Sequence, residues 1–243
     1  MNLIIDVGNS FVKLAVFNNG KLAHNETVEP EYILKHVQVL KQNYSDIEKA
    51  IISSVGKLKR ADLEIIKKDF DLLELDTQTN LPFKNLYKTP KTLGVDRMAL
   101  VAASVKTYSS KNVLIIDSGT CMTFDFVNSE NHYLGGAISP GLNMRYRSLN
   151  NLTANLPLLE ATLPDSVIGN STEESIHSGV VNGILNEITG AIEMYKLKYS
   201  DLTVILTGGD AKFLSKQLKS SIFANPNFLL EGLDYILQFN TNE

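Results

Sequence analysis

The sequence predicts an α/β protein made of two related halves, each a mixed sheet flanked by helices. Two stretches indicate the duplication, "LIIDVGNSFVKLAVF" at residues 3–17 and "VLIIDSGTCMTFDF" at residues 113–126. Each combines an apolar strand ending in Asp, a tight turn containing Gly, and a second strand. Strand and helix patterns then alternate after each stretch, which is typical of α/β folds.

The first half begins with a hairpin and continues as alternating strands and helices. "NNG" at residues 18–20 favours a tight turn because Asn and Gly tolerate positive φ. Pro30 predicts the start of a helix, in which Ile33, Val37 and Leu40 recur at helical spacing. The predicted order is strands 2–6, 11–17 and 21–28, the helix from Pro30, strand 49–55, helix 62–70, strand 72–75, an irregular segment 76–93 and helix 95–108.

The second half repeats this order after a predicted hinge at residues 109–112. Its expected elements are strands 113–117, 122–128 and 133–139, a helix opened by "SPGL" (139–142) with Pro140 at its head, a long helix 173–199, strand 202–206 and a helix after "TGGDA" (207–211). Gly179, Gly183 and Gly190 lie inside the long helix, where they predict close helix packing. The expected domains are residues 1–110 and 111–243.

Composition and charge narrow the class of protein. The 243 residues carry a net charge of −4, which offers no basic footprint for nucleic acid. No apolar run approaches the roughly 20 residues of a membrane span, and the chain opens on a strand pattern instead of a signal peptide. The single Cys121 excludes an internal disulfide. We therefore expect a cytoplasmic protein that binds neither nucleic acid nor membrane.

Cysteine and histidine chemistry is not expected in this chain. Cys121 lies within the second turn, where a nucleophile is conceivable, but no histidine lies nearby in the sequence. A small space-filling side chain is the favoured interpretation. The four histidines show no metal-ligand spacing.

The first Asp-Gly turn has the residues of a phosphate-binding loop. Asp6 ends a strand, Gly8 lets the backbone approach a ligand, Ser10 adds a hydroxyl donor, and the Lys13 ammonium can reach phosphate oxygens. A plain hairpin with an Asx-type turn explains a single such turn equally well. The second copy favours a domain pair that binds a nucleotide.

The second turn differs from the first and predicts a different task. Asp117 and Thr120 occupy the matching positions, but no lysine follows them. A carboxylate and a hydroxyl suit a cation better than a phosphate. The third glycine pair, Gly208 and Gly209, leaves room for a flat nucleoside or allows tight packing of strand and helix, and the pattern leaves both open.

"GVDR" at residues 94–97 lies between the halves at the expected start of a helix. In that position Asp96 is either a cap that complements the helix dipole or a base that accepts a hydroxyl proton during phosphoryl transfer. Arg97 is a candidate for binding an anionic group.

Together, "DVGNSFVK" (6–13), "GVDR", "DSGT" (117–120) and "TGGDA" resemble the motifs of type III pantothenate kinases, in order and spacing along nearly the whole chain. The resemblance implies two ribonuclease-H-like halves of the actin-like ATPase superfamily, the first with the phosphate-binding turn and the second with the other Asp-Gly turn and an adenosine-side turn. It also implies ATP in the cleft and phosphorylation of pantothenate to 4'-phosphopantothenate, the first step of coenzyme A biosynthesis.

The resemblance also implies roles for individual residues, an Mg²⁺ ion with ATP, a K⁺ or NH₄⁺ ion, and a homodimer with the long helix in its interface. Asp96 would be the catalytic base and Asp117 the ligand of the monovalent cation, with Asp6 near the magnesium. ATP would contact Asp6, Val7, Gly8, Asn9, Ser10, Phe11, Val12, Lys13 and Thr120. Pantothenate would contact Tyr87, Gly94, Val95, Asp96, Arg97 and Thr172.

Two positions depart from the usual pattern of that family, and two other functions stay open. Ser10 stands where Thr is usual and Val95 where Ala is usual, and neither change removes a chemical role. The alternatives are another small-molecule kinase of the same superfamily, or a nucleotide-binding regulator that has lost catalysis. Retention of Lys13, Asp96 and Asp117 argues against the regulator.

Overall fold

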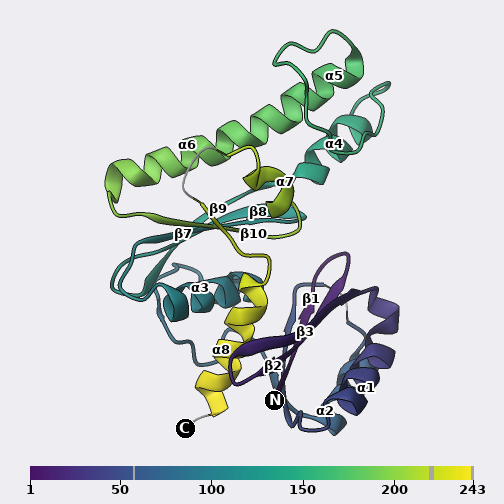
Figure 1. Cartoon of the computed structure of the whole chain (residues 1–243), viewed down its shortest axis with the longest axis vertical. Helices are drawn as coiled ribbons and strands as arrows, with labels where there is room; N and C mark the ends of the chain where they lie inside the picture. The colour runs from purple at the N-terminus through teal and green to yellow at the C-terminus, as the bar shows by residue number, and fades with distance from the viewer. Residues whose placement is uncertain (57, 219–221, 242–243) are drawn as a thin grey trace. The chain divides into compact units, whose positions relative to one another are not determined.

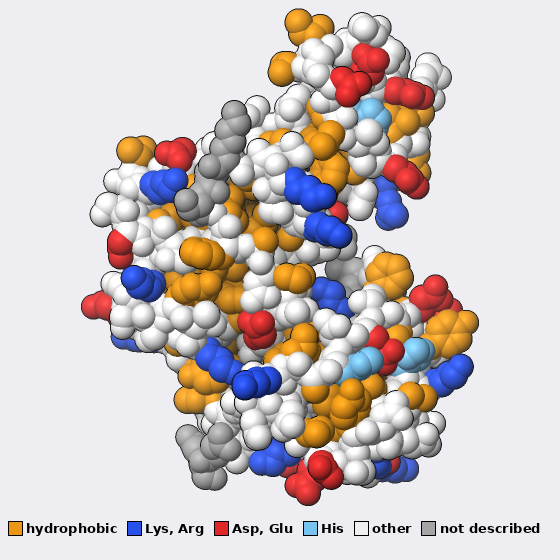
Figure 2. Space-filling model, in the orientation of Figure 1, with side chains coloured by type: hydrophobic (Ala, Val, Ile, Leu, Met, Phe, Trp, Pro, Cys, Tyr) orange, Lys and Arg blue, Asp and Glu red, His pale blue; other side chains and the backbone are white. Residues whose placement is uncertain are grey.

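The computed structural model describes residues 1–56, 58–218 and 222–241 (Figure 1). The chain forms two compact units, one of residues 1–109, 131–133 and 227–243, the other of residues 110–130 and 134–226. Among the described residues, no helix combines the length and the apolar character that a membrane crossing requires. On the face drawn in Figure 2, acidic side chains gather in the region of α5, and elsewhere acidic and basic side chains are interspersed.

The first unit is built on a five-stranded mixed sheet in the order β3-β2-β1-β4-β5. β1, β2 and β3 form an antiparallel meander, and β1, β4 and β5 run parallel. The bounds are β1 Asn2–Val7, β2 Val12–Asn18, β3 Lys21–Val28, β4 Lys49–Ser54 and β5 Asp71–Glu74. All five strands were predicted from the sequence, with ends that differ by a few residues at most.

Helices cover both faces of this sheet. One face packs on α1 (Ile33–Asn43) and α2 (Arg60–Asp69) through a core that includes Leu3, Ile5 and Leu14. α3 (Val95–Thr107) and α8 (Phe228–Thr241) pack on each other and on β4. The helix predicted at Pro30 begins with a 3₁₀ turn, Pro30–Tyr32, before α1. The segment predicted to be irregular contains only the short β6 (Lys84–Asn85) and a 3₁₀ turn, Pro90–Thr92.

The sheet of the second unit repeats the topology of the first. Its strands lie in the order β11-β10-β7-β8-β9-β6, and the first five of these match β5-β4-β1-β2-β3 position for position. The bounds are β7 Val113–Ser118, β8 Cys121–Val127, β9 His132–Pro140, β10 Thr203–Thr207 and β11 Phe223–Ala224. β7 pairs antiparallel with β8 and parallel with β10, as β1 does with β2 and β4. The predicted duplication is therefore confirmed, and it extends to the strands after each meander.

One face of this sheet is covered by α4 (Leu142–Asn151), α7 (Ala211–Ser215) and the long helical segment drawn in green in Figure 1. The long helix predicted at 173–199 consists of α5 (Thr172–His177), a π-helical turn (Ser178–Asn182) and α6 (Gly183–Lys198). Ser171 caps it, accepting a hydrogen bond from the Glu174 amide. The apolar residues predicted every four positions, Ile176 to Ile192, are buried.

Three expectations for the second unit are wrong. Pro140 does not head a helix: it ends β9, Gly141 is the N-cap, and α4 begins at Leu142. The glycines of the long helix do not permit close packing within the described residues, because a Cβ added at Gly179, Gly183 or Gly190 would meet no atom within 4 Å. Cys121 fills no space in the core, since it is exposed.

The sequence patterns missed α8, although this helix is central to the first unit. Its Asp234 is fully buried and accepts hydrogen bonds from Asn2 (2.8 Å) and Gln238 (2.6 Å). Burial raises the pKa of Asp234, while the Asn2 hydrogen bond and the Lys106 charge oppose the rise. Residues 227–243 thus group with the first unit, although they lie within the predicted second domain.

Gly232 brings α8 and α3 into direct backbone contact. A Cβ at this position would lie 1.9 Å from the Ala99 carbonyl oxygen and 2.7 Å from its carbon. We expect Gly232→Ala to destabilise the protein by about 1–3 kcal/mol, because two helix backbones must separate to admit the methyl group. Thermal unfolding measures the effect. Gly190→Ala is the matched control, since it places a methyl group in open space on a helix and should not lower the midpoint. An unchanged midpoint for Gly232→Ala would contradict the contact.

Candidate functional site

Asp6 lies at the carboxyl end of β1 between two polar neighbours. The strand register places it opposite Lys13 of β2 on one side and Ser53 of β4 on the other. Residues paired across adjacent strands project from the same face of a sheet, so the three side chains form a row. The Ser53 hydroxyl donates a hydrogen bond of 2.9 Å to Asp6 Oδ1, and both side chains are buried.

The negative charge of Asp6 is disfavoured because the carboxylate is buried. Burial raises the pKa of Asp6 above its ordinary value, the Ser53 hydrogen bond and the Lys13 charge lower it, and the charge of Asp96 raises it. Asp96 is therefore near enough to act on Asp6. The charges of Asp96 and Lys13 thus act on Asp6 in opposite directions, and a cation bound by Asp6 would relieve the repulsion between the two carboxylates.

The turn after β1 is closed by its own backbone. The Gly8 amide donates to the Phe11 carbonyl (3.0 Å), so this N–H is used within the turn and does not point at a ligand. Asn9, Ser10 and Phe11 are exposed, whereas Val7 and Val12 at the strand ends are buried. The predicted phosphate contacts are thus left to the exposed residues of the turn and to Lys13.

Gly56, which was not identified from the sequence, packs against the turn after β1. The Gly56 amide donates to the Val7 carbonyl (3.1 Å), and a Cβ at Gly56 would lie 2.1 Å from the Gly8 carbonyl oxygen. Only glycine allows the loop after β4 to approach this closely. Its position after a buried strand is the one signal in the sequence that could have suggested it.

Asp96 lies in the first turn of α3, whose N-cap is Gly94. Its Oδ1 accepts a hydrogen bond from the Arg97 amide (2.8 Å), so the capping interpretation is confirmed. The same residue interacts with Asp6, as described above, so capping does not exclude a further role. A Cβ at Gly94 would lie 2.3 Å from Asp96 Oδ1, and the glycine therefore leaves the space that the carboxylate occupies. Val95, between them, is partly exposed.

Arg97 is buried against two tyrosine rings. The guanidinium carbon lies 5.6 Å from the centre of the Tyr87 ring and 6.0 Å from that of Tyr133, and the rings are stacked on each other at 5.9 Å. Attraction between a cation and an aromatic face holds the guanidinium in place. The structure thus brings Tyr87 and Arg97 together, as predicted. Tyr133 was missed because its sequence context is that of an ordinary strand.

The second turn is packed against the third glycine element. Gly208 has a φ of +94°, and a Cβ there would lie 2.4 Å from Asp117 Oδ1 and 2.3 Å from the Ser118 carbonyl oxygen. Gly208 is therefore packed tightly against the end of β7, which is a different contact from the strand-to-helix packing considered from the sequence. At Gly209 a Cβ would meet nothing within 4 Å, so this position is open. The Asp210 amide donates to the Ser118 carbonyl (3.0 Å), and burial raises the pKa of Asp210.

Thr120 is exposed at the tip of the second turn, and its backbone is tied to the start of α4. The Gly141 amide donates to the Thr120 carbonyl (3.2 Å). A Cβ at Gly141 would lie 2.1 Å from the Gly119 carbonyl oxygen, so the segment between β9 and α4 rests directly on the turn. No pattern in the sequence indicates this contact.

Thr172 is exposed at the first position of α5, beside a hollow of about 910 Å³. The hollow lies within the second unit and is bordered by α4 and by the segment before α5. The Arg145 side chain lines the hollow and is the basic group in its lining. The hollow combines hydroxyls, one cation and apolar side chains such as Leu149 and Ile176, a composition that suits a polar ligand with an aliphatic portion.

The predicted site residues divide between the units. Asp6 to Lys13, Tyr87 and Gly94 to Arg97 belong to the first, and Asp117, Thr120 and Thr172 belong to the second. Within the first unit the charges of Lys13 and Asp96 both influence the pKa of Asp6. Within the described residues, no three acidic, histidine or cysteine side chains form a metal-binding group. A cation bound at Asp6 or at Asp117 would therefore need oxygen atoms of the backbone or of the substrate in addition to the carboxylate.

Comparison with known proteins identifies the family. The family model described as "Type III pantothenate kinase" matches residues 2–194. The type III pantothenate kinase of Christiangramia forsetii is 53% identical over 244 residues, with full coverage of both chains, and that of Flavobacterium johnsoniae is 44% identical with 98% of each chain covered. A glucokinase from an Antarctic psychrotroph superposes with a TM-score of 0.55 at 11% identity, covering 98% of each chain, which places the fold among the sugar kinases and actin-like ATPases. The chain belongs to the type III pantothenate kinase family.

Proposed function

We propose that this protein phosphorylates pantothenate with ATP, giving 4'-phosphopantothenate and ADP in the first step of coenzyme A biosynthesis. Family membership supports the reaction. Within the structure, the first turn of α3 gives the main support for this reaction. It contains the acidic side chain of Asp96 and, next to it, the Arg97 guanidinium, which lies over the Tyr87 ring. Phosphoryl transfer to an alcohol needs a proton acceptor beside the hydroxyl and a fixed position for the acceptor molecule.

In this proposal Asp96 accepts the proton of the pantothenate hydroxyl as the phosphoryl group arrives. Arg97 pairs with the pantothenate carboxylate, and Tyr87 fixes its guanidinium plane. Gly94 leaves the room in which the Asp96 carboxylate sits, and both Gly94 and Val95 would contact pantothenate. Thr172 contributes a hydroxyl to the substrate from the hollow beside α5.

In this proposal each Asp-Gly turn contributes its own ATP-binding residues. Ser10 and Lys13 of the first turn bind phosphate oxygens, and Thr120 of the second contributes a hydroxyl. Magnesium, which neutralises charge on the phosphates, fits Asp6: this buried carboxylate has a raised pKa, and a cation would lower the cost of its charge. With one protein carboxylate, the remaining ligands would come from phosphate and water.

A monovalent cation fits the second turn. Asp117 supplies a carboxylate, and glycine at position 208 keeps the space beside Asp117 Oδ1 and the Ser118 carbonyl oxygen free of a side chain. Potassium and ammonium are bound by oxygen atoms of this kind, and a single carboxylate balances a single positive charge.

Replacing Asp117 with Asn is expected to abolish stimulation by potassium or ammonium, because the amide cannot balance the charge of the cation. ADP formation should then be equal in KCl and in the same concentration of tetramethylammonium chloride. ADP should be quantified by ion-exchange chromatography, since some coupling enzymes need potassium themselves. Asp201→Asn, which changes an exposed carboxylate of the same unit, should leave the stimulation intact. Wild-type activity that is insensitive to these ions would rule out the site.

The function itself is tested by ADP production that depends on pantothenate. Sugars or acetate in place of pantothenate examine the alternative of another kinase of the same superfamily. Nucleotide binding without turnover of any of these substrates would favour the alternative of an inactive regulator. We further propose that the protein is a cytoplasmic homodimer with the long helix in its interface, as the resemblance to the family implies. The division of the chain into ribonuclease-H-like domains at 1–110 and 111–243 stays a prediction, although the contacts of α8 group it with the first unit.

A further inference from the structure

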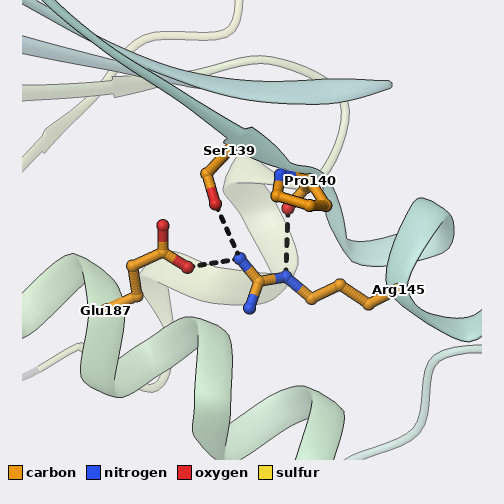
Figure 3. Close-up of polar contacts among 4 residues, drawn as sticks. All are labelled: Ser139, Pro140, Arg145 and Glu187. Carbon is orange, nitrogen blue, oxygen red and sulfur yellow. Dashed lines mark hydrogen bonds and ion pairs between the residues drawn. The ribbon is translucent and has the colours of Figure 1, made fainter.

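Arg145 ties three parts of the second unit together (Figure 3). From α4, its Nε donates a hydrogen bond to the Pro140 carbonyl (3.0 Å), and its Nη2 donates to the Ser139 hydroxyl (3.1 Å). The same Nη2 forms an ion pair with Glu187 of α6. One guanidinium therefore fixes the end of β9 to two helices that cover the sheet.

The end of β9 is the segment that rests on the second Asp-Gly turn. Pro140 is followed by Gly141, which donates to the Thr120 carbonyl and has no room for a Cβ above the Gly119 and Thr120 carbonyls. A shift of Pro140 would therefore be transmitted to the turn through direct backbone contact. Thr120 has no comparable support from its own side chain, which is exposed.

We propose that Arg145 is a positioning residue for ATP: by clamping the end of β9 to α6, it holds Gly141 on the turn and thereby sets the place of Thr120. This inference rests on the proposed function, in which Thr120 contacts ATP. Arginine suits the task because its planar fork reaches a carbonyl, a hydroxyl and a carboxylate at once, which the single ammonium of lysine does not.

The ion pair alone does not explain the residue. The Arg145 and Glu187 side chains keep 21% and 33% of their surface exposed, and pairs with that much solvent contact contribute little to stability. The position of the hydrogen-bond acceptors explains Arg145 better than the strength of its ion pair. Two of its three acceptors belong to the last two residues of β9, beside the contact with the turn.

The test compares Arg145→Met and Arg145→Lys with Arg147→Met, which alters an exposed arginine on the same helix. For Arg145→Met we expect the KM for ATP to rise roughly tenfold, the loss expected for charged hydrogen bonds, with kcat near the wild-type value. Arg145→Lys should restore only part of the affinity, and Arg147→Met should behave as the wild type. Thermal unfolding of each variant establishes that the measured enzyme is folded at the assay temperature.

A double-mutant cycle with Thr120→Ala separates positioning from a merely structural role. If Arg145 acts through Thr120, Arg145→Met raises the KM for ATP much less in the Thr120→Ala background than in the wild type. Equal increases in both backgrounds, or an unchanged KM in Arg145→Met, would overturn the proposal. If the wild type makes no ADP with pantothenate, the proposed function itself is wrong. That result can be distinguished from the outcomes of the double-mutant cycle, which all require an active wild type.

Discussion

Asp96→Asn is expected to lower kcat for pantothenate phosphorylation by about 10²- to 10⁴-fold, the contribution typical of a general base. The amide cannot accept the hydroxyl proton. Its oxygen can still accept the hydrogen bond that Asp96 Oδ1 receives from the Arg97 amide, so the start of α3 is preserved. The KM for ATP should change little, and steady-state ADP formation with both substrates varied measures both parameters.

Asp62→Asn is the matched control for this substitution. Asp62 occupies the first turn of α2 as Asp96 occupies the first turn of α3, so its loss removes a comparable interaction with a helix dipole. It should cost a little stability and no activity. An Asp96→Asn enzyme that retains wild-type kcat would show that Asp96 is only a cap.

The second large effect is expected at Arg97. Arg97→Met should raise the KM for pantothenate by about 10²- to 10³-fold, because a charged partner of the substrate carboxylate is lost in a buried site. The KM for ATP should stay near that of the wild type. Arg97→Lys should not restore affinity, since an ammonium neither stacks on the Tyr87 and Tyr133 rings in the same way nor pairs with both carboxylate oxygens.

Because Arg97 is buried, its substitution also threatens the fold, and Tyr87 offers a milder test. Tyr87→Ala removes one ring of the cage and should raise the KM for pantothenate several-fold, in line with a cation–π contribution of about 0.5–2 kcal/mol. Tyr87→Phe keeps the ring and should have a small effect. If all these variants bind pantothenate normally, Arg97 serves the structure and the carboxylate is bound elsewhere.

Local patterns in the sequence were sufficient for the secondary structure near the site. The paired strands around Asp6 and Asp117 follow from alternating apolar residues and glycine turns, and the structure confirms both hairpins. The start of α3 at Val95 agrees with the helix pattern. These features depend on residues close together in the chain, and for that reason one sequence is enough to find them.

The partners of the site residues could not be predicted in the same way. Ser53 donates a hydrogen bond to Asp6 although 47 positions separate them in the sequence. Gly208, which follows β10, lies beside Asp117 of β7 although the two are far apart in the sequence. Neither serine nor glycine carries a pattern that names a distant neighbour. The expectation that the glycines of the long helix pack closely is wrong for the same reason: the pattern does not show what faces them.

The duplicated α/β plan, the two turns and the motif at residues 94–97 could be predicted from the sequence, because periodicity, turn chemistry and short motifs are local properties. Three features could be seen only in the folded chain: α8 packs in the first unit, Tyr133 lies with Tyr87 against Arg97, and Gly208 and Gly141 contact the second turn. Those contacts join residues that the chain separates widely. They arise from sheet register and helix packing, which depend on the whole fold.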